Sequence, residues 1–430
     1  MALTGRAVGL LALGIVPVLL VPRWVTVATW AVLWAGGLTV DAARAVPVRA
    51  VQVRRAPIPA LRHGQRTESH LQVFNTASRV LRAVVRDAWQ PSAGTGPNRH
   101  RLRVPPEELR RVRTELHPWR RGEIHAAGVT VRSFGPFGLL ARQDTVEVPG
   151  MLRVLPEFSS RRHLPSRLAR LREMDGRTAV HVRGQGTEFD SLREYVIGDD
   201  VRAIDWRASA RRADVVVRTW RPERDRRVLI VLDTSRLAAA RLGPAPRLEA
   251  GIEAALLLSA LATRAGDRVD LVAVDRTVRA RVRGVQGAAL MSTMARALAP
   301  VEAELVEPDW ALVAREVRER LSQRALVVFL TALEPGAVES GLISVAATVG
   351  RDHQVMLASA EDPEEHRMRR QRGSTAELFD AAAAERAELE RAALAERLIR
   401  TGARVVRRGP QELAPAVADS YLALKAAGQL

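Results

Sequence analysis

The sequence predicts a multi-domain chain with three kinds of structure in succession: a transmembrane helical hairpin, an all-β sandwich and a doubly wound α/β domain. Two uncharged apolar runs open the chain, and short alternating segments follow as far as Pro156. From Arg227 onward, strand-like and helix-like patterns alternate. With 430 residues the chain is too long for one ordinary core. The predicted parts are 1–44, 45–156, 157–226 and 227–430.

The first part contains two apolar runs, residues 7–22 and 24–40, which hold 16 and 17 uncharged residues. Each run would span about 24 to 26 Å as a helix, a little less than a hydrocarbon core of about 30 Å. The second run carries three tryptophans that suit an interfacial belt: Trp24, Trp30 and Trp34. The alternative is a cleaved signal peptide, but the apolar region continues past Arg23 for a second full segment. We therefore expect membrane lipid to hold this hairpin.

Charge is distributed unevenly along the chain, whose net charge is +18. The first 227 residues hold 39 arginines against 21 acidic residues, and the remainder holds 27 basic and 27 acidic residues. Arginines follow the hairpin closely, and positive charge stays on the cytoplasmic side of a membrane. We therefore expect a protein of the cell (inner or plasma) membrane with cytoplasmic soluble domains. No basic run is interleaved with aromatics in the pattern of nucleic-acid-binding proteins, so we expect no nucleic-acid partner.

The second part, from about Val46 to Pro156, alternates polar and apolar residues in short runs separated by proline and glycine. This pattern predicts an antiparallel sandwich. The stretches WRRG at 119–122 and FGPFGL at 134–139 fall at its turns. Their glycines are explained most simply by backbone conformations with positive φ, and a ligand role is the alternative.

The third part is centred on residues 184–223, where arginines alternate with carboxylates and tryptophans. Arginine and carboxylate groups make planar two-point contacts, so this pattern predicts a charge-paired lattice. Two interpretations stay open, a binding surface and an inter-domain brace that is buried and mutually satisfied. Each charged residue here has neighbours of opposite charge, which favours the brace. We also expect strands at AIDW (203–206) and ADVVVRTW (213–220). The candidate residues are Arg193, Glu194, Tyr195, Gly198, Asp199, Arg202, Asp205, Trp206 and Arg211.

The fourth part begins with the buried strand pattern VLIVLD, which ends at Asp233. Its alternating strands and helices predict a mostly parallel sheet with helices on both faces. Open sheets of this kind bind ligands at the carboxyl ends of their strands, so Asp233 and Ser235 are further candidates.

Several catalytic patterns are missing from the sequence. There is no cysteine, and the one lysine, Lys425, lies in the last predicted helix, which excludes thiol chemistry and a P-loop. Neither HExxH nor Gly-x-Ser-x-Gly occurs. We therefore predict no enzyme activity and no cofactor.

The central stretch resembles the hallmark of the "domain of unknown function 58" family. Its matching residues are Leu192-Arg193-Glu194-Tyr195, Gly198-Asp199, Arg202-x-Ile204-Asp205-Trp206 and Ser209-Ala210-Arg211. The paired hydrophobic segment, the RRG and GPFGL elements and the last domain are also similar to that family. The resemblance implies a von Willebrand factor A-like fold for 227–430 and membrane anchoring. It also implies work beside a ring ATPase of the AAA+ class known as MoxR, in assembly or quality control of other complexes.

In related domains an Asp-x-Ser-x-Ser motif holds a divalent cation through carboxylate and hydroxyl oxygens. Here Leu237 replaces the second serine, Arg236 opposes a cation, and Ala332 stands where the family tends to place an acidic residue. The preferred prediction is a degenerate, metal-free site, and weak Mg²⁺ binding through Asp233 and Ser235 is the alternative. The competing functions are a divalent-metal-dependent adhesion or ligand-binding module and an enzyme that acts through the acidic hallmark residues.

Overall fold

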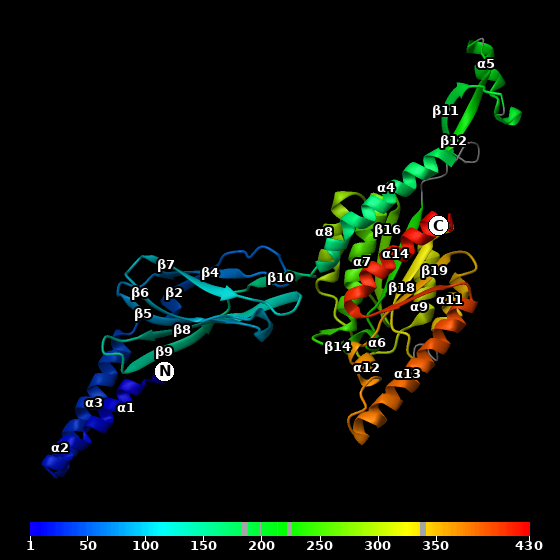
Figure 1. Cartoon of the computed structure of the whole chain (residues 1–430). Helices are drawn as coiled ribbons and strands as arrows, with labels where there is room; N and C mark the ends of the chain where they lie inside the picture. The colour runs from blue at the N-terminus through cyan, green and yellow to red at the C-terminus, as the bar shows by residue number, and fades with distance from the viewer. Residues whose placement is uncertain (182–187, 198, 213, 222–225, 336–340) are drawn as a thin grey trace. The chain divides into compact units, whose positions relative to one another are not determined.

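The protein is described by a computed structural model that covers residues 1–181, 188–197, 199–212, 214–221, 226–335 and 341–430. The chain forms two compact units, Met1–Glu157 and Phe158–Leu430 (Figure 1). The first unit contains the N-terminal helices and the β-sheets that follow them. The second contains a hairpin of two strands and a larger α/β domain. The chain is therefore a multi-domain mixture of helices and sheets, as the change of periodicity predicts.

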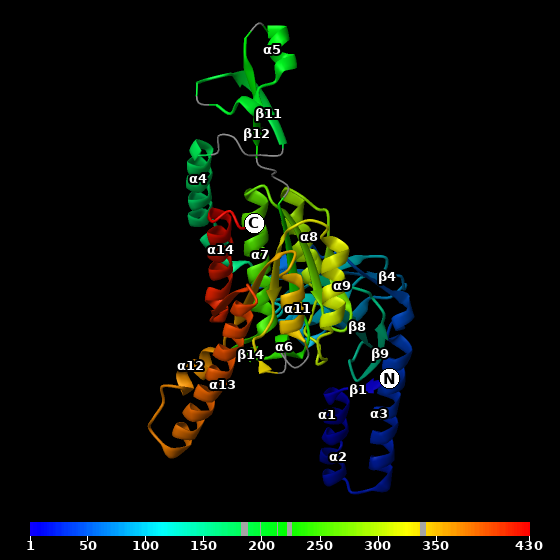
Figure 2. The same cartoon turned by 90° about the vertical axis from the view of Figure 1, so that its right-hand side faces the viewer.

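The N-terminal segment contains one helix that is long and apolar enough to cross a membrane, within Trp24–Ala50. It follows β1 (Ala2–Leu3), α1 (Gly5–Leu13) and α2 (Ile15–Leu20), and is α3 (Trp24–Arg44). Figure 2 shows α1 and α2 beside α3, and contacts join both to it.

Trp30 and Trp34 make hydrogen bonds to α1 that the sequence does not predict. Their indole N–H groups donate to the carbonyl oxygens of Leu10 and Ala7, at 3.3 and 2.9 Å, and so join the two helical segments. An indole N–H in apolar surroundings needs an acceptor, and a neighbouring helix supplies it. Gly14 leaves room for the Trp30 ring, because a Cβ there would lie 2.2 Å from its Cδ1.

Two sheets follow, built largely from antiparallel strands. The first has the order β2-β4-β7; the second has the path β1-β9-β8-β10-β3, with β5 paired to β8 and β6 paired to β5. Only β10 and β3 pair in parallel. Their bounds are β2 (Val51–Arg55), β3 (Leu61–Arg62), β4 (Thr67–Asn75), β5 (Leu81–Trp89), β6 (Arg99–Val104), β7 (Leu109–Leu116), β8 (Gly122–Phe134), β9 (Leu140–Val146) and β10 (Met151–Leu155).

Side chains that alternate along these strands fill a core between the two sheets, and a second cluster forms around Trp89 and Ile124. Leu71 and Val73 of β4 share a cluster with Val85 of β5 and Val131 of β8. The alternate side chains of β5 are less buried or exposed, as expected for a strand with one face on the core. Gly122 and Gly138 have φ angles of 128° and 69°, which confirms the predicted reason for these two glycines.

Both ends of the N-terminal helical segment are fastened to the same part of this β structure. At the start, β1 pairs with β9 through Ala2 and Ala141. At the far end, the Asp41 carboxylate of α3 accepts hydrogen bonds from the backbone N–H groups of Phe137, Leu139 and Leu140. The turn after β8 is therefore part of the joint with α3.

The second unit contains a six-stranded sheet of order β17-β16-β13-β18-β19-β20. All neighbouring pairs are parallel except β16 with β17. The strands are β13 (Arg227–Asp233), β16 (Arg268–Val274), β17 (Val278–Val282), β18 (Leu326–Leu330), β19 (Gln354–Ala360) and β20 (Arg404–Arg408). The first part of the unit adds α4 (Leu164–His181), β11 (Glu188–Glu194), α5 (Trp206–Arg212) and β12 (Val216–Arg221).

Helices cover both faces of the sheet, as predicted. Side chains of α7 (Arg247–Arg264), α8 (Ala288–Leu298) and α14 (Pro410–Ala426) share a core with Ile230. Side chains of α9 (Trp310–Arg320), α11 (Leu342–Val349) and α13 (Thr375–Arg400) share another with Leu229 and Val231. Successive side chains of a strand point to opposite faces, so β13 supplies both cores.

Three local predictions in this unit need correction. The sequence predicts a short helix over 166–173, which in the structure is part of the longer α4. Helix α12 (Pro363–Met368) is not predicted by the sequence pattern. The segment AIDW is not a strand, because Ile204 makes a single bridge to Val217 and Trp206 opens α5. The Asp205 carboxylate accepts the first backbone N–H groups of that helix and so favours it over an extended chain. The sequence predicts a helix near 337–349. In the structure this helix is α11 and begins at Leu342, and residues 336–340 lie outside the described residues.

Candidate functional site

The hallmark residues lie on a β-hairpin and its connecting segment. Strands β11 and β12 are antiparallel, with Arg193 opposite Val217 and Glu194 opposite Val216. The connection contains the short 3₁₀ helix η4 (Val201–Ala203) and α5. Gly198 lies outside the described residues. The hairpin thus brings together residues from both ends of the motif, about 20 positions apart in the chain.

Arg193 and Asp199 form a two-point ion pair at the end of β11. The two guanidinium Nη atoms donate to the two carboxylate oxygens at 2.7 and 2.6 Å. One of these oxygens also accepts the N–H of Val196 at 2.9 Å. The hydrogen bond to Asp199 raises the pKa of Arg193. The pair fixes the turn after β11, because it holds both a side chain and the backbone.

Asp205 organises the other half of the segment. One carboxylate oxygen accepts the N–H groups of Arg207 and Ala208 at 3.1 and 3.0 Å, and the other accepts Arg218 Nε at 2.8 Å. The hydrogen bond from Ala208 is the largest influence, followed by that from Arg218, and together they lower the pKa of Asp205. Ser209 completes the closure by donating to Asp205 O and accepting from Val216 N.

These ion pairs contradict the predicted burial of the charges. Both join residues of the same hairpin, and neither is buried: the side chains of Arg193 and Arg218 are 37% and 47% exposed. They hold the hairpin in shape instead of forming a buried lattice. Arg202, Arg211 and Glu194 are exposed, and Tyr195 is half-buried with its N–H bonded to Val215 O.

The same hairpin exposes apolar side chains. Ile197 is 96% exposed and Trp206 is 68% exposed. Val196 and Val201 are also exposed. Exposed apolar groups that gather on one small element are typical of a surface for a partner. Sequence reasoning found Trp206 but missed Val196, Ile197 and Val201, although all four stand inside the motif.

The second group of candidates lies at the carboxyl edge of the six-stranded sheet. Asp233, which ends β13, is buried; its Oδ1 accepts Ser235 N at 2.8 Å and its Oδ2 accepts Thr331 Oγ1 at 2.5 Å. Thr331 follows β18, which pairs with β13, so its hydroxyl reaches the carboxylate. Burial raises the pKa of Asp233, and the hydrogen bonds from Thr331 and Ser235 oppose this only in part. Thr331 was not predicted, because the family pattern points to an acidic residue at the next position, Ala332.

Asp275, which follows β16, lies beside this group. Its carboxylate accepts Thr234 Oγ1 at 2.9 Å and Arg279 Nε at 2.6 Å. Burial acts to raise the pKa of Asp275, but the bonds from Arg279, Thr277 and Thr234 outweigh it and the pKa is lowered. A small pocket next to Asp233 is otherwise mostly apolar, lined by Val231, Val274, Pro308, Trp310, Val313, Phe329 and Thr331.

A hard divalent cation takes about six oxygen ligands. The oxygens around Asp233 are already engaged in hydrogen bonds with one another and with the backbone. Ser235 Oγ accepts the N–H of Leu237, and the hydroxyl of Thr331 already donates to Asp233. The Leu237 side chain belongs to an apolar core. Among the described residues, no group of three or more His, Cys, Asp or Glu side chains could hold a metal ion. This set therefore fits a divalent cation poorly.

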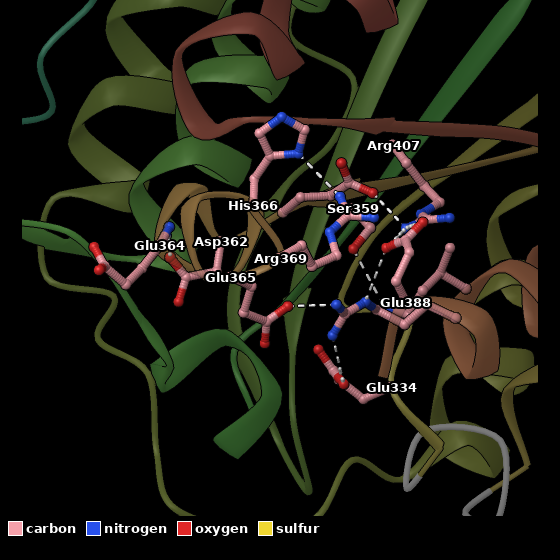
Figure 3. Close-up of polar contacts among 12 residues, drawn as sticks. Glu334, Ser359, Asp362, Glu364, Glu365, His366, Arg369, Glu388 and Arg407 are labelled. Carbon is pink, nitrogen blue, oxygen red and sulfur yellow. Dashed lines mark hydrogen bonds and ion pairs between the residues drawn. The ribbon is translucent and has the colours of Figure 1, made fainter. Parts of the chain in front are cut away.

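A third cluster, not predicted from the sequence, lies where strands β18 to β20 meet α12 and α13. Figure 3 shows Glu334, Glu365, Glu388 and Arg407 directed toward one another. Arg407 contacts Glu361 and Glu388, each at 2.6 Å. Arg391 of α13, which is nearly buried, contacts Glu365, and it lies 3.8 Å from Glu334 and 3.7 Å from Glu388. The alternating charges of α13 were the only signal in the sequence, and they are equally typical of a solvated helix.

Comparison with known proteins gives a family but no reaction. The model of a family described as "Protein of unknown function DUF58" matches residues 191–407. The uncharacterized protein YeaD of Bacillus subtilis (strain 168) is 23% identical over 244 residues, which cover 57% of this chain and 58% of YeaD. The match therefore spans little more than half of that relative.

Two solved structures are similar to a quarter of the chain. They are the CARDB domain of the PF1109 protein from Pyrococcus furiosus, in complex with di-metal ions, and a FixG-related protein from Vibrio parahaemolyticus. Their identities are 12% and 10%, and their TM-scores are 0.19 and 0.15. Each match covers 24% of this chain, and it covers 91% and 94% of the respective solved chains.

Proposed function

The chain belongs to the DUF58 family of proteins of unknown function, and from that premise we propose that it is a membrane-anchored interaction protein whose partner is an AAA+ ATPase of the MoxR class. In this proposal the soluble domains lie in the cytoplasm and serve the assembly or quality control of other complexes. The ATPase supplies the chemical energy, and this chain supplies position and contact. No covalent chemistry is assigned to the chain itself.

The observation that carries the proposal is the build of the hallmark hairpin. Two ion pairs, Arg193 with Asp199 and Asp205 with Arg218, fix its loops, and these loops expose Ile197 and Trp206. A preorganised surface loses little conformational entropy when a partner binds. Exposed tryptophan and arginine side chains are also the residue types that dominate binding energy at interfaces.

The carboxyl edge of the α/β domain offers a second contact for the same partner. Strand order β17-β16-β13-β18-β19-β20 is the order 3-2-1-4-5-6 with the third strand antiparallel, which supports the von Willebrand factor A-like assignment. Such sheets bind ligands where the strand order reverses, here between β13 and β18. Leu305 lies in the connection between α8 and α9 and is 82% exposed. The carbonyl of the next residue, Val306, accepts a hydrogen bond from Arg236 N, which keeps this connection near the carboxyl edge.

Membrane anchoring by a hairpin is supported by three features of the first unit. Helix α3 has 21 residues and so a length of about 31 Å, enough for a hydrocarbon core. Both ends of the helical segment are attached to the β9 region, through β1 and through Asp41. Two ends on one side require an even number of crossings. The arginines that follow α3 support a cytoplasmic position for that side.

The proposal is tested by binding between the full-length chain in nanodiscs and a purified MoxR-class AAA+ ATPase. Trp206→Ala is expected to weaken binding about thirtyfold, the factor for loss of a hot-spot side chain worth about 2 kcal/mol. Leu305→Ala tests the second contact in the same way. The matched control is Phe379→Ala, because Phe379 is 72% exposed but lies on α13. Equal binding by all four proteins, or no binding by any, would overturn the proposal.

A divalent-metal-dependent adhesion or ligand-binding module is the second candidate. It is favoured by the convergence of oxygens from Asp233, Ser235 and Thr331 at one strand edge, and it is opposed by their mutual hydrogen bonds. Calorimetric titration of the full chain with Mg²⁺ separates the two functions. The interaction protein should give no specific heat, whereas tight binding that Asp233→Ala abolishes would establish the metal-dependent module.

A further inference from the structure

The turn Gly135–Leu139 packs along the last two turns of α3. Asp41 is fully buried, and its carboxylate accepts Phe137 N at 2.8 Å, Leu139 N at 2.5 Å and Leu140 N at 3.0 Å. A Cβ on Gly135 would lie 2.4 Å from Asp41 Oδ1, and a Cβ on Gly37 would lie 3.2 Å from Leu139 Cδ1. The turn is thus held against the helix over Gly37–Asp41.

This contact sets the depth of the turn if α3 spans a bilayer. Gly37 and Asp41 precede the helix end at Arg44 by seven and three residues, which corresponds to about 10 and about 5 Å along the axis. The uncharged run of α3 ends at Val40, just before Asp41. If this run marks the hydrocarbon core, the turn lies at the boundary between the acyl chains and the lipid headgroups. Phe137, at its tip, is 57% exposed.

Three arginines surround this turn and are held by backbone carbonyl groups. Arg79 Nη1 donates to Ala43 O at 2.9 Å, and Arg82 Nη1 donates to Pro136 O at 2.9 Å. Arg142 donates to Ala42 O through Nε at 3.2 Å and Nη2 at 2.8 Å. A guanidinium has five N–H donors, so each of the three keeps donors in reserve. Within the first unit, which the structure describes completely, none of these arginines has an ion pair with a carboxylate.

We propose that this membrane-facing end of the sandwich, formed by Arg79, Arg82, Phe137 and Arg142, binds anionic phospholipid headgroups. The inference rests on the proposed membrane anchor. Phosphate groups accept the remaining guanidinium donors, and the Phe137 ring enters the boundary between headgroups and acyl chains. The carbonyl contacts keep the arginines in place before lipid arrives. The hairpin and this face together hold the sandwich on the bilayer by two kinds of contact.

The depth of the face is tested by spin labels on the full-length chain in nanodiscs. The chain has no cysteine, so single cysteines can be introduced without background. Labels at Phe137→Cys and Trp119→Cys are a matched pair, because both are exposed aromatics and they lie beyond opposite ends of β8. The label at 137 should be accessible to oxygen and protected from a water-soluble relaxation agent. The label at 119 should behave in the opposite way.

A third label, at Val32→Cys on α3, separates this inference from the anchor on which it rests. Lipid contact at 32 together with water contact at 137 would overturn the inference and leave the anchor intact. Water contact at both positions would overturn the anchor as well.

Lipid selectivity is tested with a fluorophore at Ser78→Cys, next to Arg79. Nanodiscs contain phosphatidylcholine with a small fraction of nitroxide-labelled lipid, either phosphatidylglycerol or phosphatidylcholine. Quenching by the anionic lipid should exceed that by the neutral lipid, with about a fivefold local enrichment for each arginine. Arg79→Gln with Arg82→Gln should remove most of the preference, whereas Arg120→Gln at the far end should preserve it. Equal quenching by both lipids in the unaltered protein would overturn the proposal.

Discussion

Asp233 ends β13 and Asp275 follows the neighbouring strand β16, yet their surroundings shift their pKa values in opposite directions. Asp233 is buried without a cationic partner, so its pKa is raised. Asp275 accepts the guanidinium of Arg279, so its pKa is lowered. The difference arises because one carboxylate receives only neutral donors and the other receives a charge. The pair shows how a single strand edge can hold two carboxyl groups with separate titration behaviour.

This contrast predicts how stability depends on pH. Because the folded-state pKa of Asp233 lies above its ordinary value of 3.8, its contribution is complete below that value and is lost as pH rises through the folded-state pKa. Asp233→Asn should therefore gain stability relative to the unaltered protein as pH rises across this window. Asp275→Asn should behave in reverse, because the contribution of Asp275 is lost as pH falls through its lowered pKa.

The measurement is denaturant unfolding of the full chain between about pH 3 and pH 8, with both variants followed in parallel. If the free energy of unfolding changed with pH in the same way in Asp233→Asn and Asp275→Asn, the opposite pKa shifts assigned to the two carboxyl groups would be wrong.

The single lysine of the chain is enclosed in the second unit. Lys425 Nζ donates to Asp267 Oδ1 at 2.8 Å, and Tyr421 OH donates to Asp267 Oδ2 at 2.5 Å. All three side chains are 8% exposed or less, and they join α14 to the turn before β16. A buried carboxylate without its cation is costly.

Lys425→Met should therefore destabilise the full chain by about 3 kcal/mol in denaturant unfolding. Lys425→Met combined with Asp267→Leu should recover part of that loss, because no uncompensated charge remains. If Lys425→Met alone were as stable as the original chain, the buried Asp267 carboxylate would not need Lys425 as its charge partner.

At the scale of elements, the carboxylate cluster decides how α12 and α13 attach to the sheet. Arg391 of α13 is surrounded by Glu365 of α12, Glu334 after β18 and Glu388 of its own helix. Burial acts to lower the pKa of Arg391, but these carboxylates outweigh it and the pKa is raised. One cation thus holds three carboxylates that would otherwise repel one another.

Arg391→Met should release α12 from the sheet edge, because the remaining carboxylates have like charge. Hydrogen exchange of the backbone amides in 363–368 should report a loss of about 3 kcal/mol in local stability. Arg386→Met is the matched control on the same helix, since the Arg386–Glu390 pair is largely exposed and worth well under 1 kcal/mol. Equal exchange in both variants would mean that α12 is held by other contacts.

At the scale of the whole molecule, the joint between α3 and the sandwich links positions that are nearly one hundred residues apart. Three backbone N–H groups converge on Asp41, and two arginines cap the carbonyls of the last helical turn. A helix end needs such partners because its last carbonyl groups have none within the helix. The N-terminal helical segment is therefore an integral part of the first unit's fold.

Asp41→Asn should speed hydrogen exchange of the Phe137, Leu139 and Leu140 amides by about ten- to a hundredfold in the nanodisc-bound chain. A hydrogen bond to a charged acceptor contributes about 1.5 to 3 kcal/mol, which corresponds to that range. Asp144→Asn on β9 is the control, because Asp144 is exposed and bonds only its neighbour Thr145 N. Unchanged exchange in Asp41→Asn would show that the turn is fixed by other contacts.

The sequence by itself determined the succession of parts and most of the strands and helices. Periodicity is a local property. The sequence pattern predicts helices over 288–298 and 375–400, and the structure has helices with these bounds. The sequence also placed Asp233 at a strand end and predicted the second strand of the hallmark hairpin, but it did not predict β11. The segment AIDW was wrongly predicted as a strand because a capping carboxylate, Asp205, outweighs the apolar pattern around it.

Only the tertiary structure decided which charges meet. The chain has 66 basic and 48 acidic residues, so very many pairings are compatible with the sequence. Distant segments brought Arg391 to Glu334, Asp41 to the turn after β8, and Thr331 to Asp233. Ion pairs and hydrogen bonds depend on distances of about 3 Å, and such distances between remote positions exist only once the chain has folded.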